Sequence, residues 1–233
     1  MELKDAPETY FFKLWPKIEA NWIRIVWGGS IIVVAVGLIS FYSWQRGQKE
    51  IIAGKALTQF MMTAPRNGAS DPQADLFLKI AGDYQGTSAG QRAWLQGAAV
   101  LFAAGRYPDA QTQFQKFLDA HPDGFFAAQA ALGVATSLDA QGKPDLATGA
   151  YQRVISAYSD TTAAMSAKFA LAQIDERQNK LMDALNLYED IKRNYPNSPL
   201  ASEAELRMME LKTKLPSASS PSTAPAAPFK LNH

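Results

Sequence analysis

Side chains that could carry out acid–base or metal chemistry are few in this sequence, and they are scattered. It contains two histidines, His121 and His233, and no cysteine, so thiolate ligands and thiol nucleophiles are excluded. Adjacent acids, such as Asp175–Glu176 and Glu189–Asp190, fall on expected solvent faces of helices, and we interpret them as solvating residues. No phosphate-binding glycine loop, zinc-protease, serine-hydrolase or EF-hand motif is present. The sequence therefore predicts a protein that is not an enzyme and that uses no cofactor, metal or small-molecule substrate.

The composition fits one globular domain with extensions. The chain has 233 residues, of which 47% are hydrophobic and 19% are charged, and its formal net charge is +1. This charge balance gives no electrostatic footprint for nucleic acid, so we expect no nucleic-acid partner.

One apolar stretch is long enough to cross a bilayer. The twenty residues "IVWGGSIIVVAVGLISFYSW", Ile25 to Trp44, carry no charge. As a helix they would extend about 30 Å, the thickness of the hydrocarbon core. The expected membrane-interface anchors at the two ends are Trp22, Arg24, Trp44 and Arg46. We therefore predict a single-pass transmembrane helix over residues 23–44.

A cleaved signal peptide is the alternative interpretation of this stretch. Its apolar region would be shorter, and small residues would follow it, whereas this chain continues with the bulky "SFYSWQRG". We therefore favour an uncleaved signal anchor. Three basic residues flank each end, so the positive-inside rule does not decide the topology; they are Lys13, Lys17 and Arg24 before the span, and Arg46, Lys49 and Lys55 after it.

A helical pattern recurs after the apolar stretch with a period of 37 residues. It begins at Gly105, Gly142 and Asn179, residue types that tolerate the left-handed conformation that ends a helix. The aligned positions that follow carry a small residue, an aromatic one, an apolar one, an aromatic or histidine, and often proline: Ala110, Phe114, Phe117, His121 and Pro122; Ala147, Tyr151, Val154, Tyr158 and Ser159; Ala184, Tyr188, Ile191, Tyr195 and Pro196. We expect the aromatic positions to be packing residues, and we interpret His121 as a packing or surface residue.

A second helix follows each loop in the same register. Its aligned positions are Ala127, Ala130, Leu132 and Ala135, then Ala164, Ala167, Phe169 and Ala172, then Ala201, Ala204, Leu206 and Met209. A degenerate earlier copy fits through Gly68, Phe77, Ile80, Tyr84, Ala93, Leu95 and Ala98. The pattern predicts an all-α fold in which about three repeats, a degenerate first copy and a capping helix stack as a solenoid.

These residues resemble the tetratricopeptide-repeat family. The positions Trp94, Ala98, Leu101, Gly105, Ala110, Phe114 and Pro122 are similar to its sequence of large, small, large, turn glycine, alanine, aromatic and proline. This chain departs from the family in its period of 37 rather than 34 residues, and in Lys168 and Asp175, which occupy weak signature positions of the last full copy. The resemblance implies a helix–turn–helix solenoid, with a groove that such repeats can use for peptides.

These patterns divide the chain into five parts. We expect a short N-terminal segment (1–22), the transmembrane helix (23–44), a juxtamembrane helix and linker (45–67), the repeat domain (68–215) and a disordered tail (216–233) rich in proline, serine and alanine. In the juxtamembrane helix, the residues expected to pack under the first repeat are Ile51, Ile52, Leu57, Phe60 and Met61. The last helix, roughly Pro199 to Leu215, carries many charges and is expected to form a polar cap.

The arrangement over about Tyr10 to Leu215 resembles the bacterial ancillary SecYEG translocon subunit and the related cell-division coordinator repeat domain. The resemblance rests on "FFKLWPKIEANW", one span ending in "FYSWQRGQ", an alanine-rich juxtamembrane helix and divergent repeats. It implies a single-pass protein of the bacterial inner membrane with a periplasmic repeat domain. The implied partners are the Sec translocon and a membrane-anchored periplasmic chaperone. The "YPNSP" loops also resemble outer-membrane assembly lipoproteins and the TolA-binding coordinator, but the chain has no lipidation cysteine.

The function expected from these features is a membrane-anchored protein–protein interaction scaffold that assists translocation or envelope-protein folding. Two alternatives remain open at this point. The chain could be a structural subunit of another membrane complex, docked once and permanently, or a cytosol-facing receptor for the tails of client proteins.

Overall fold

The described part of the chain is entirely helical. The computed structural model describes residues 7–63 and 71–215, without the side chains of residues 7–21 and 24–26. These ranges form nine helices and no strand: α1 (Pro7–Thr63), α2 (Asp71–Asp83), α3 (Ser88–Ala103), α4 (Tyr107–Ala120), α5 (Ala127–Ala140), α6 (Pro144–Ala157), α7 (Thr162–Arg177), α8 (Leu181–Asn194) and α9 (Pro199–Lys214). The predicted all-α solenoid is confirmed, while the predicted disordered tail lies outside the described residues.

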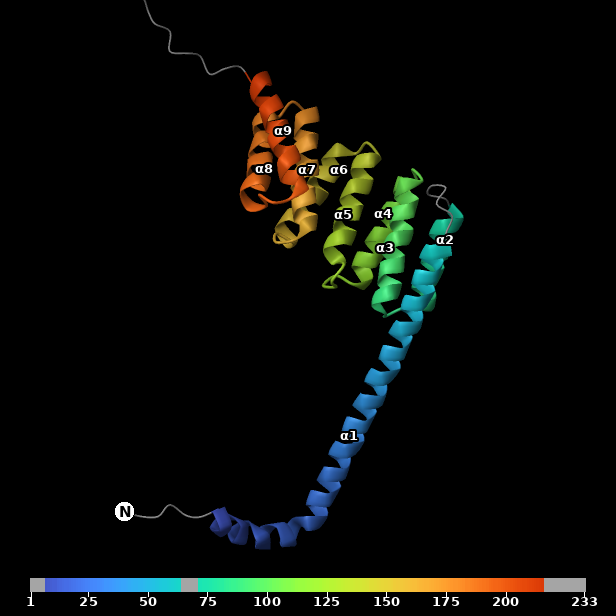
Figure 1. Cartoon of the computed structure of the whole chain (residues 1–233), viewed down its shortest axis with the longest axis vertical. Coiled ribbons are helices and arrows are strands. Elements are labelled where there is room, and N and C mark those ends of the chain that lie inside the picture. The colour runs from blue at the N-terminus through green and yellow to red at the C-terminus, as the bar shows by residue number, and fades with distance from the viewer. Residues whose placement is uncertain (1–6, 64–70, 216–233) are drawn as a thin grey trace, which may run out of the picture.

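Helix α1 is a continuous helix of 57 residues; most of it projects straight away from the repeats, and its N-terminal end bends to the side (Figure 1). It runs without a break through the predicted boundaries at residues 22 and 44. Within the described residues, its stretch Trp27–Thr63 is the one helix long and apolar enough to cross a membrane. The large apolar side chains of this stretch are exposed, with Trp27 at 69% and Val33 at 71% of their maximal area. Exposed apolar patches of this extent mark sites of contact with other proteins or with membranes.

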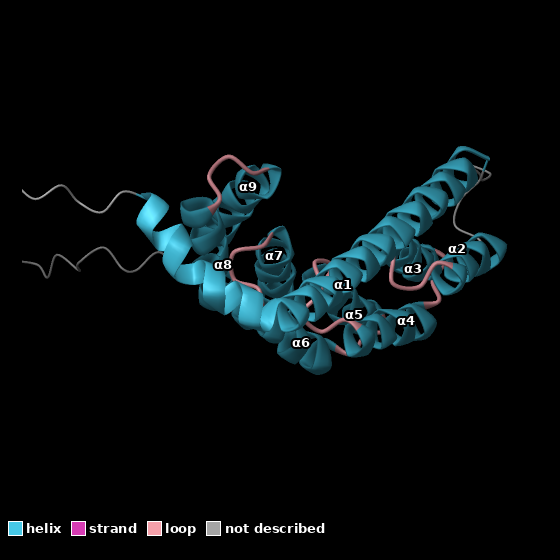
Figure 2. Cartoon of the chain, turned by 90° about the horizontal axis from the view of Figure 1, so that it is seen from below, coloured by secondary structure: helices cyan, strands magenta, loops and turns pink. Residues whose placement is uncertain are grey.

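The remaining helices pack as antiparallel neighbours in chain order (Figures 1 and 2). A continuous apolar core runs from α2 to α7, a second cluster joins α7, α8 and α9, and a third joins α1, α2 and α3. Each helix therefore covers the apolar face of the next, as in a stacked repeat array.

The turns that close the repeats adopt the predicted left-handed conformation. The backbone φ is +78° at Gly105, +71° at Gly142 and +58° at Asn179. In each turn the next residue donates its N–H to a carbonyl five residues back; for Arg106 and Leu101 the N–O distance is 2.9 Å. These bonds satisfy carbonyls that the end of a helix leaves without a partner. The 37-residue register thus reflects a repeated turn.

A side-chain N-cap also repeats in the 37-residue register, at the start of alternate helices. Thr87, Thr161 and Ser198 each accept a hydrogen bond from a backbone N–H in the first turn of α3, α7 and α9. The aligned position before α5 is Gly124, and α5 begins without a side-chain cap. The loop "HPDGFF" is therefore the irregular connection of the array.

The juxtamembrane part of α1 packs under the first repeat. Ala53 and Leu57 are buried, and the ring of Phe60 meets that of Phe77 edge-on with 4.7 Å between centroids. The prediction that Ile51, Ile52 and Met61 also pack there is wrong, since all three are more than half exposed. They lie on the other faces of the helix, because only one stripe of α1 can touch α2 and α3.

A carboxylate fixes this junction. The side chain of Glu50 in α1 accepts hydrogen bonds from the backbone N–H groups of Ser88, at 2.8 Å, and Ala89, at 3.0 Å. These donors belong to the first turn of α3, where the helix dipole favours a negative charge. The contact joins residues that are 38 and 39 positions apart.

Two expectations about charged residues need correction. Asp175 is 8% exposed, so it is a buried residue of α7 and not part of a solvent face. Asp190 is partly buried and pairs with Lys168. Helix α9 carries the expected charges, yet it also exposes Leu206 and Met209 at about 60%. These two residues align with Phe169 and Ala172, which α8 covers, and no described helix follows α9 to cover them.

Candidate functional site

The helices form two layers of unequal spacing. Helix α5 touches both α3 and α7, and α7 also touches α9, whereas no contact joins α4 to α6 or α6 to α8 in the described chain. Because helices on the inner side of a curved stack lie closer together, α3, α5 and α7 form the inner surface. Inner surfaces of helical repeat arrays are where extended partners bind.

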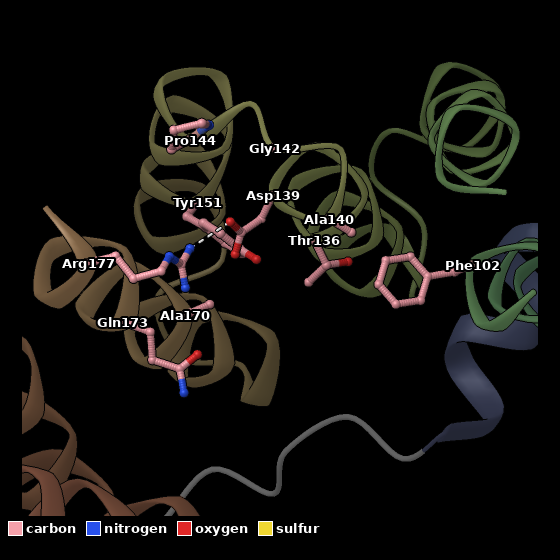
Figure 3. Close-up of a pocket in the computed structure, with 10 residues that line it drawn as sticks. All are labelled: Phe102, Thr136, Asp139, Ala140, Gly142, Pro144, Tyr151, Ala170, Gln173 and Arg177. Carbon is pink, nitrogen blue, oxygen red and sulfur yellow. Dashed lines mark hydrogen bonds and ion pairs between the residues drawn. The ribbon is translucent and has the colours of Figure 1, made fainter. Parts of the chain in front are cut away.

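A cavity of about 720 Å³ opens on this inner surface, in the size range of ligand pockets. Figure 3 shows its lining, which comes from α3, α5, α6 and α7. The lining combines apolar side chains with a few polar ones: Phe102, Thr136, Asp139, Ala140, Gly142, Pro144, Tyr151, Ala170, Gln173 and Arg177. We call this surface the inner groove.

An ion pair crosses the inner groove. The guanidinium of Arg177 in α7 donates to the carboxylate of Asp139 in α5 at 2.7 Å, as the dashed line in Figure 3 marks. The side chain of Arg177 is 54% exposed and that of Asp139 is 26% exposed, so the arginine keeps donors free for a ligand. Tyr151 lies beneath this pair, and its burial, together with the charge of Asp139, raises the pKa of its hydroxyl. The hydroxyl therefore stays protonated and neutral.

The predicted signature residues lie mostly inside the array. The alanines Ala98, Ala110, Ala147 and Ala184 are fully buried, and Leu101, Phe114, Tyr151 and Tyr188 are buried beside them. Gly105 lies in its turn, while Pro122 and Pro196 lie in loops that follow α4 and α8. Small residues at the helix crossings let the helices approach closely; at Gly133, an added Cβ would lie 2.6 Å from the ring of Phe114.

Trp94 is half-buried and connects α3 to α4. Its indole N–H donates to Gln113 at 3.1 Å, and its ring meets Phe117 edge-on at 5.6 Å and His121 at 6.4 Å between centroids. His121 thus packs against two aromatic rings. The described residues contain no cluster of three potential metal ligands.

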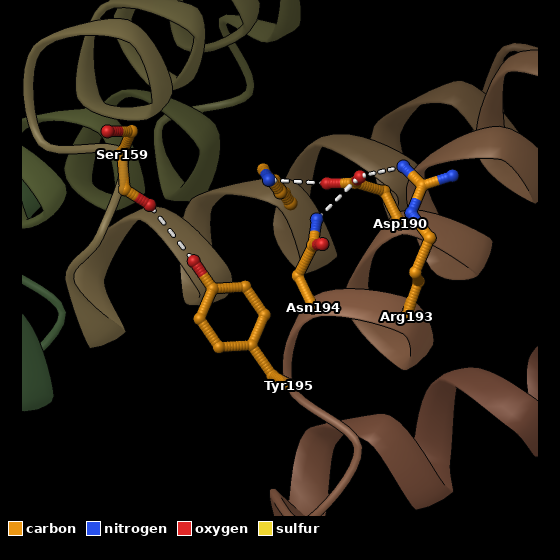
Figure 4. Close-up of polar contacts among 6 residues, drawn as sticks. Ser159, Asp190, Arg193, Asn194 and Tyr195 are labelled. Carbon is orange, nitrogen blue, oxygen red and sulfur yellow. Dashed lines mark hydrogen bonds and ion pairs between the residues drawn. The ribbon is translucent and has the colours of Figure 1, made fainter.

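The third repeat replaces the tryptophan by Lys168. Its ammonium pairs with Asp190 of α8 and lies 5.8 Å from the centre of the Tyr195 ring. Figure 4 shows the network around Asp190, to which Arg193 and Asn194 also donate. Although partial burial opposes ionisation of Asp190, its bonds to Lys168 and Arg193 hold its pKa below the ordinary value. The hydroxyl of Tyr195 reaches across to the carbonyl of Ser159 at 2.9 Å, which ties this repeat to the preceding one.

Sequence reasoning placed Tyr151 in the core but missed the rest of the inner groove. The missed side chains are Phe102, Thr136, Asp139, Gln173 and Arg177. A signal for them exists in the register, since Thr136 aligns with Gln173, and Ala140 with Arg177, one period of 37 residues apart. Positions whose type changes from repeat to repeat, between small residues that do not change, mark the inner face.

The expected interface anchors lie on α1. Trp22 and Trp44 are 60% and 62% exposed. The guanidinium of Arg46 lies over the ring of Tyr42 at 4.9 Å from its centroid, a cation–π arrangement. The side chain of Arg24 lies outside the described residues.

The sequence matches two related protein families. Residues 15–150, more than half of the chain, match the family described as tetratricopeptide repeat-like domain. Residues 132–199 match the tetratricopeptide repeat itself. Among curated proteins, none shows detectable similarity to this chain.

Several solved structures are similar to parts of the chain. The Yersinia enterocolitica type III secretion chaperone SycD, solved with a peptide of the translocator YopD, is 19% identical, with a TM-score of 0.48 over 56% of this chain and 98% of that chain. MamA from Desulfovibrio magneticus RS-1 is 17% identical, with a TM-score of 0.48 over 72% and 98%. BtubC from P. vanneervenii is 12% identical, with a TM-score of 0.46 over 82% and 98%.

Proposed function

Because this chain belongs to the tetratricopeptide repeat-like domain family, we propose that it is a membrane-anchored scaffold that binds segments of other proteins in its inner groove. Proteins built from such repeats are generally non-enzymatic scaffolds for protein–protein interaction. The observation that carries the proposal is the inner groove itself, a cavity of about 720 Å³ on the face where the helices crowd together.

The chemistry of the inner groove suits a polypeptide. Phe102, Ala140 and Ala170 offer apolar area, while Thr136 and Gln173 offer hydrogen-bonding groups for a backbone. The exposed donors of Arg177 add an attraction for a carboxylate of the bound segment. A peptide that presents apolar side chains and one acidic group fits this surface best.

Anchoring rests on the exposed apolar part of α1. A helix that presents Trp27, Ile31 and Val34 to its surroundings, with none of its most apolar window buried, gains free energy by entering a bilayer. We propose that residues 23–44 span the membrane, that residues 45–67 lead to the repeat domain of residues 68–215, and that residues 216–233 form a tail.

The cellular setting that we propose is the bacterial inner membrane, with the repeats in the periplasm beside the Sec translocon. The proposed partners are the translocon and a membrane-anchored periplasmic chaperone, and the proposed role is to assist proteins as they emerge. The single span and the repeat architecture support this setting through their resemblance to the ancillary translocon subunit. A structural subunit of another membrane complex and a cytosol-facing receptor are the competing functions.

Topology is tested by cysteine labelling, because the chain has no cysteine of its own. Ser156→Cys places one thiol on an exposed face of α6, and Ser43→Cys places one within the apolar part of α1. We expect a membrane-impermeant maleimide to label Ser156→Cys in intact bacteria with a permeabilised outer membrane, and to leave Ser43→Cys unlabelled. Labelling of Ser156→Cys only after lysis would favour the cytosol-facing receptor.

Groove binding is tested by a photo-crosslinking amino acid at Gln173, with Gln152 on the exposed face of α6 as the matched control. We expect adducts with the translocon channel or the periplasmic chaperone from position 173 and none from position 152. Equal adducts at both positions, or none at either, would contradict binding in the inner groove.

A further inference from the structure

A second cavity lies where α1 meets the turn between α2 and α3. It has a volume of about 430 Å³. One wall comes from α1, the other from the turn: Tyr42, Gln45, Arg46, Gly47, Lys49 and Glu50 face Gln85, Gly86 and Thr87. We call it the junction cavity. It is separate from the inner groove and shares no residue with it.

The charge of the junction cavity is set by the position of Glu50. Arg46 and Glu50 are four residues apart on α1, a spacing at which opposite charges can form an ion pair. Both carboxylate oxygens of Glu50 instead accept N–H groups of α3, at 2.8 and 3.0 Å. Neither Arg46 nor Lys49 has a carboxylate within ion-pair distance among the described residues. The cavity is therefore lined by two cationic side chains, and the charge of its one acidic side chain, Glu50, is partly compensated by the N-terminus of α3.

The position of the junction cavity relative to the proposed bilayer follows from the rise per residue of α1. The apolar stretch ends at Trp44, and at 1.5 Å per residue Arg46 and Lys49 lie roughly 3 and 8 Å further along the axis. The headgroup layer on each side of a bilayer is about 5–8 Å thick, so both cations lie at the depth of lipid phosphates. Tyr42, over which Arg46 stacks, lies at the boundary with the hydrocarbon.

We propose that the junction cavity binds the phosphate headgroup of an anionic phospholipid. Arg46 and Lys49 contact the phosphate, while the amides of Gln45 and Gln85 hydrogen-bond the polar headgroup. Since α1 and the α2–α3 turn both line the cavity, the lipid fastens the repeat domain to the membrane surface at a defined tilt. This inference rests on the proposed anchoring of α1.

The test uses the full chain reconstituted in vesicles of phosphatidylcholine with or without 20% phosphatidylglycerol. Flotation first reports insertion, and native mass spectrometry of the extracted protein then reports retained lipid. We expect phosphatidylglycerol to be retained by the parent chain, and retention to fall about five-fold or more in Arg46→Gln/Lys49→Gln. The neutral change Gln85→Ala reduces retention without altering charge.

The charge-matched control is Lys55→Gln/Lys79→Gln, which removes two exposed cations outside the cavity and should leave retention unchanged. Equal loss in both double variants, or equal retention of the two lipids, would overturn the inference while leaving anchoring intact. Tight binding of inorganic phosphate by the parent chain in phosphatidylcholine vesicles, without preferential retention of phosphatidylglycerol, would show soluble phosphate to be the ligand, and would also overturn it. Failure of the parent chain to float with vesicles would overturn the anchoring, and this inference with it.

Discussion

Arg177 of α7 reaches Asp139 of α5 across the inner groove, at 2.7 Å, and this pair is the one ion pair among the residues that line it. Both partners are partly exposed, so their attraction contributes little to folding. The pair joins two helices that line the inner groove, so under the proposed function it matters for binding more than for stability.

The Arg177→Ala variant should separate binding from stability. Exposed ion pairs contribute about 0.2–1 kcal/mol, so the free energy of unfolding should fall by no more than that. Loss of a charged donor in the groove should weaken binding of an acidic client segment by about 10-fold, which corresponds to about 1.4 kcal/mol. Fluorescence anisotropy with the peptide identified by crosslinking at position 173 checks this. Arg153→Ala, on the exposed face of α6, should change neither quantity.

Gly133→Ala should destabilise the array. The new Cβ would lie 2.6 Å from the Phe114 ring, between α4 and α5, and neither element can shift without disturbing its neighbours. Overpacking of this kind costs about 1–3 kcal/mol. In Gly149→Ala nothing lies within 4 Å of the added Cβ, and removal of a helical glycine should stabilise by about 0.5–1 kcal/mol. Urea unfolding of both variants checks the contrast, and equal effects would contradict the close approach at Gly133.

Asp175 should make stability depend on pH. Burial raises its pKa above the ordinary 3.8, an effect that Lys180 opposes and Asp183 adds to. The folded state therefore binds a proton more tightly than the unfolded chain, and this group's contribution to stability falls as pH rises through the window above 3.8. Asp175→Asn should remove this pH-dependent contribution. The free energy of unfolding of the variant, minus that of the parent, should therefore be higher at pH 7 than at pH 4. Urea unfolding across this range measures it, and a difference that is constant with pH would contradict the burial.

The variant Asp175→Leu replaces the buried carboxylate by an apolar side chain and should stabilise the domain. The aligned positions in the preceding repeats are Leu101 and Leu138, both buried. Leucine should place apolar area where a carboxylate is now desolvated, and should stabilise the domain at pH 7 by roughly 1–2 kcal/mol. Thermal unfolding followed by circular dichroism checks it, with Asp183→Leu as an exposed control that should show no gain.

Glu50→Gln should loosen the junction between α1 and the repeats. Glutamine offers one acceptor oxygen, whereas the two carboxylate oxygens of Glu50 each accept one N–H group, from Ser88 and from Ala89. The amide also lacks the negative charge that the helix dipole of α3 attracts. The expected loss is about 1–2 kcal/mol. Hydrogen exchange at the amides of residues 88 and 89 should accelerate by about 10-fold, while exchange in α8 stays unchanged. Slow exchange of both amides in the variant would contradict the contact.

The sequence predicts the repeat well, because each repeat position has a local physical meaning. Gly105, Gly142 and Asn179 are visible as turns because few residue types adopt a positive φ. The inner groove depends instead on the angles between successive helix pairs, which small differences in packing determine. Its side chains Thr136 and Arg177 therefore look like ordinary polar helix residues. Glu50 was missed for a related reason, since its partners lie 38 and 39 residues away and donate only backbone groups.

The unbroken course of α1 has a geometric consequence. Since a helix turns by about 100° and rises 1.5 Å per residue, the direction in which the inner groove faces around the axis of α1, relative to the apolar stretch, is set by the number of residues between Trp44 and Glu50. One alanine inserted there would swing the groove by more than a quarter turn while lifting it hardly at all. Seven inserted residues would bring it back to nearly its first bearing, about 10 Å higher. The length of α1 thus sets both the direction in which the inner groove faces and its distance from the apolar stretch.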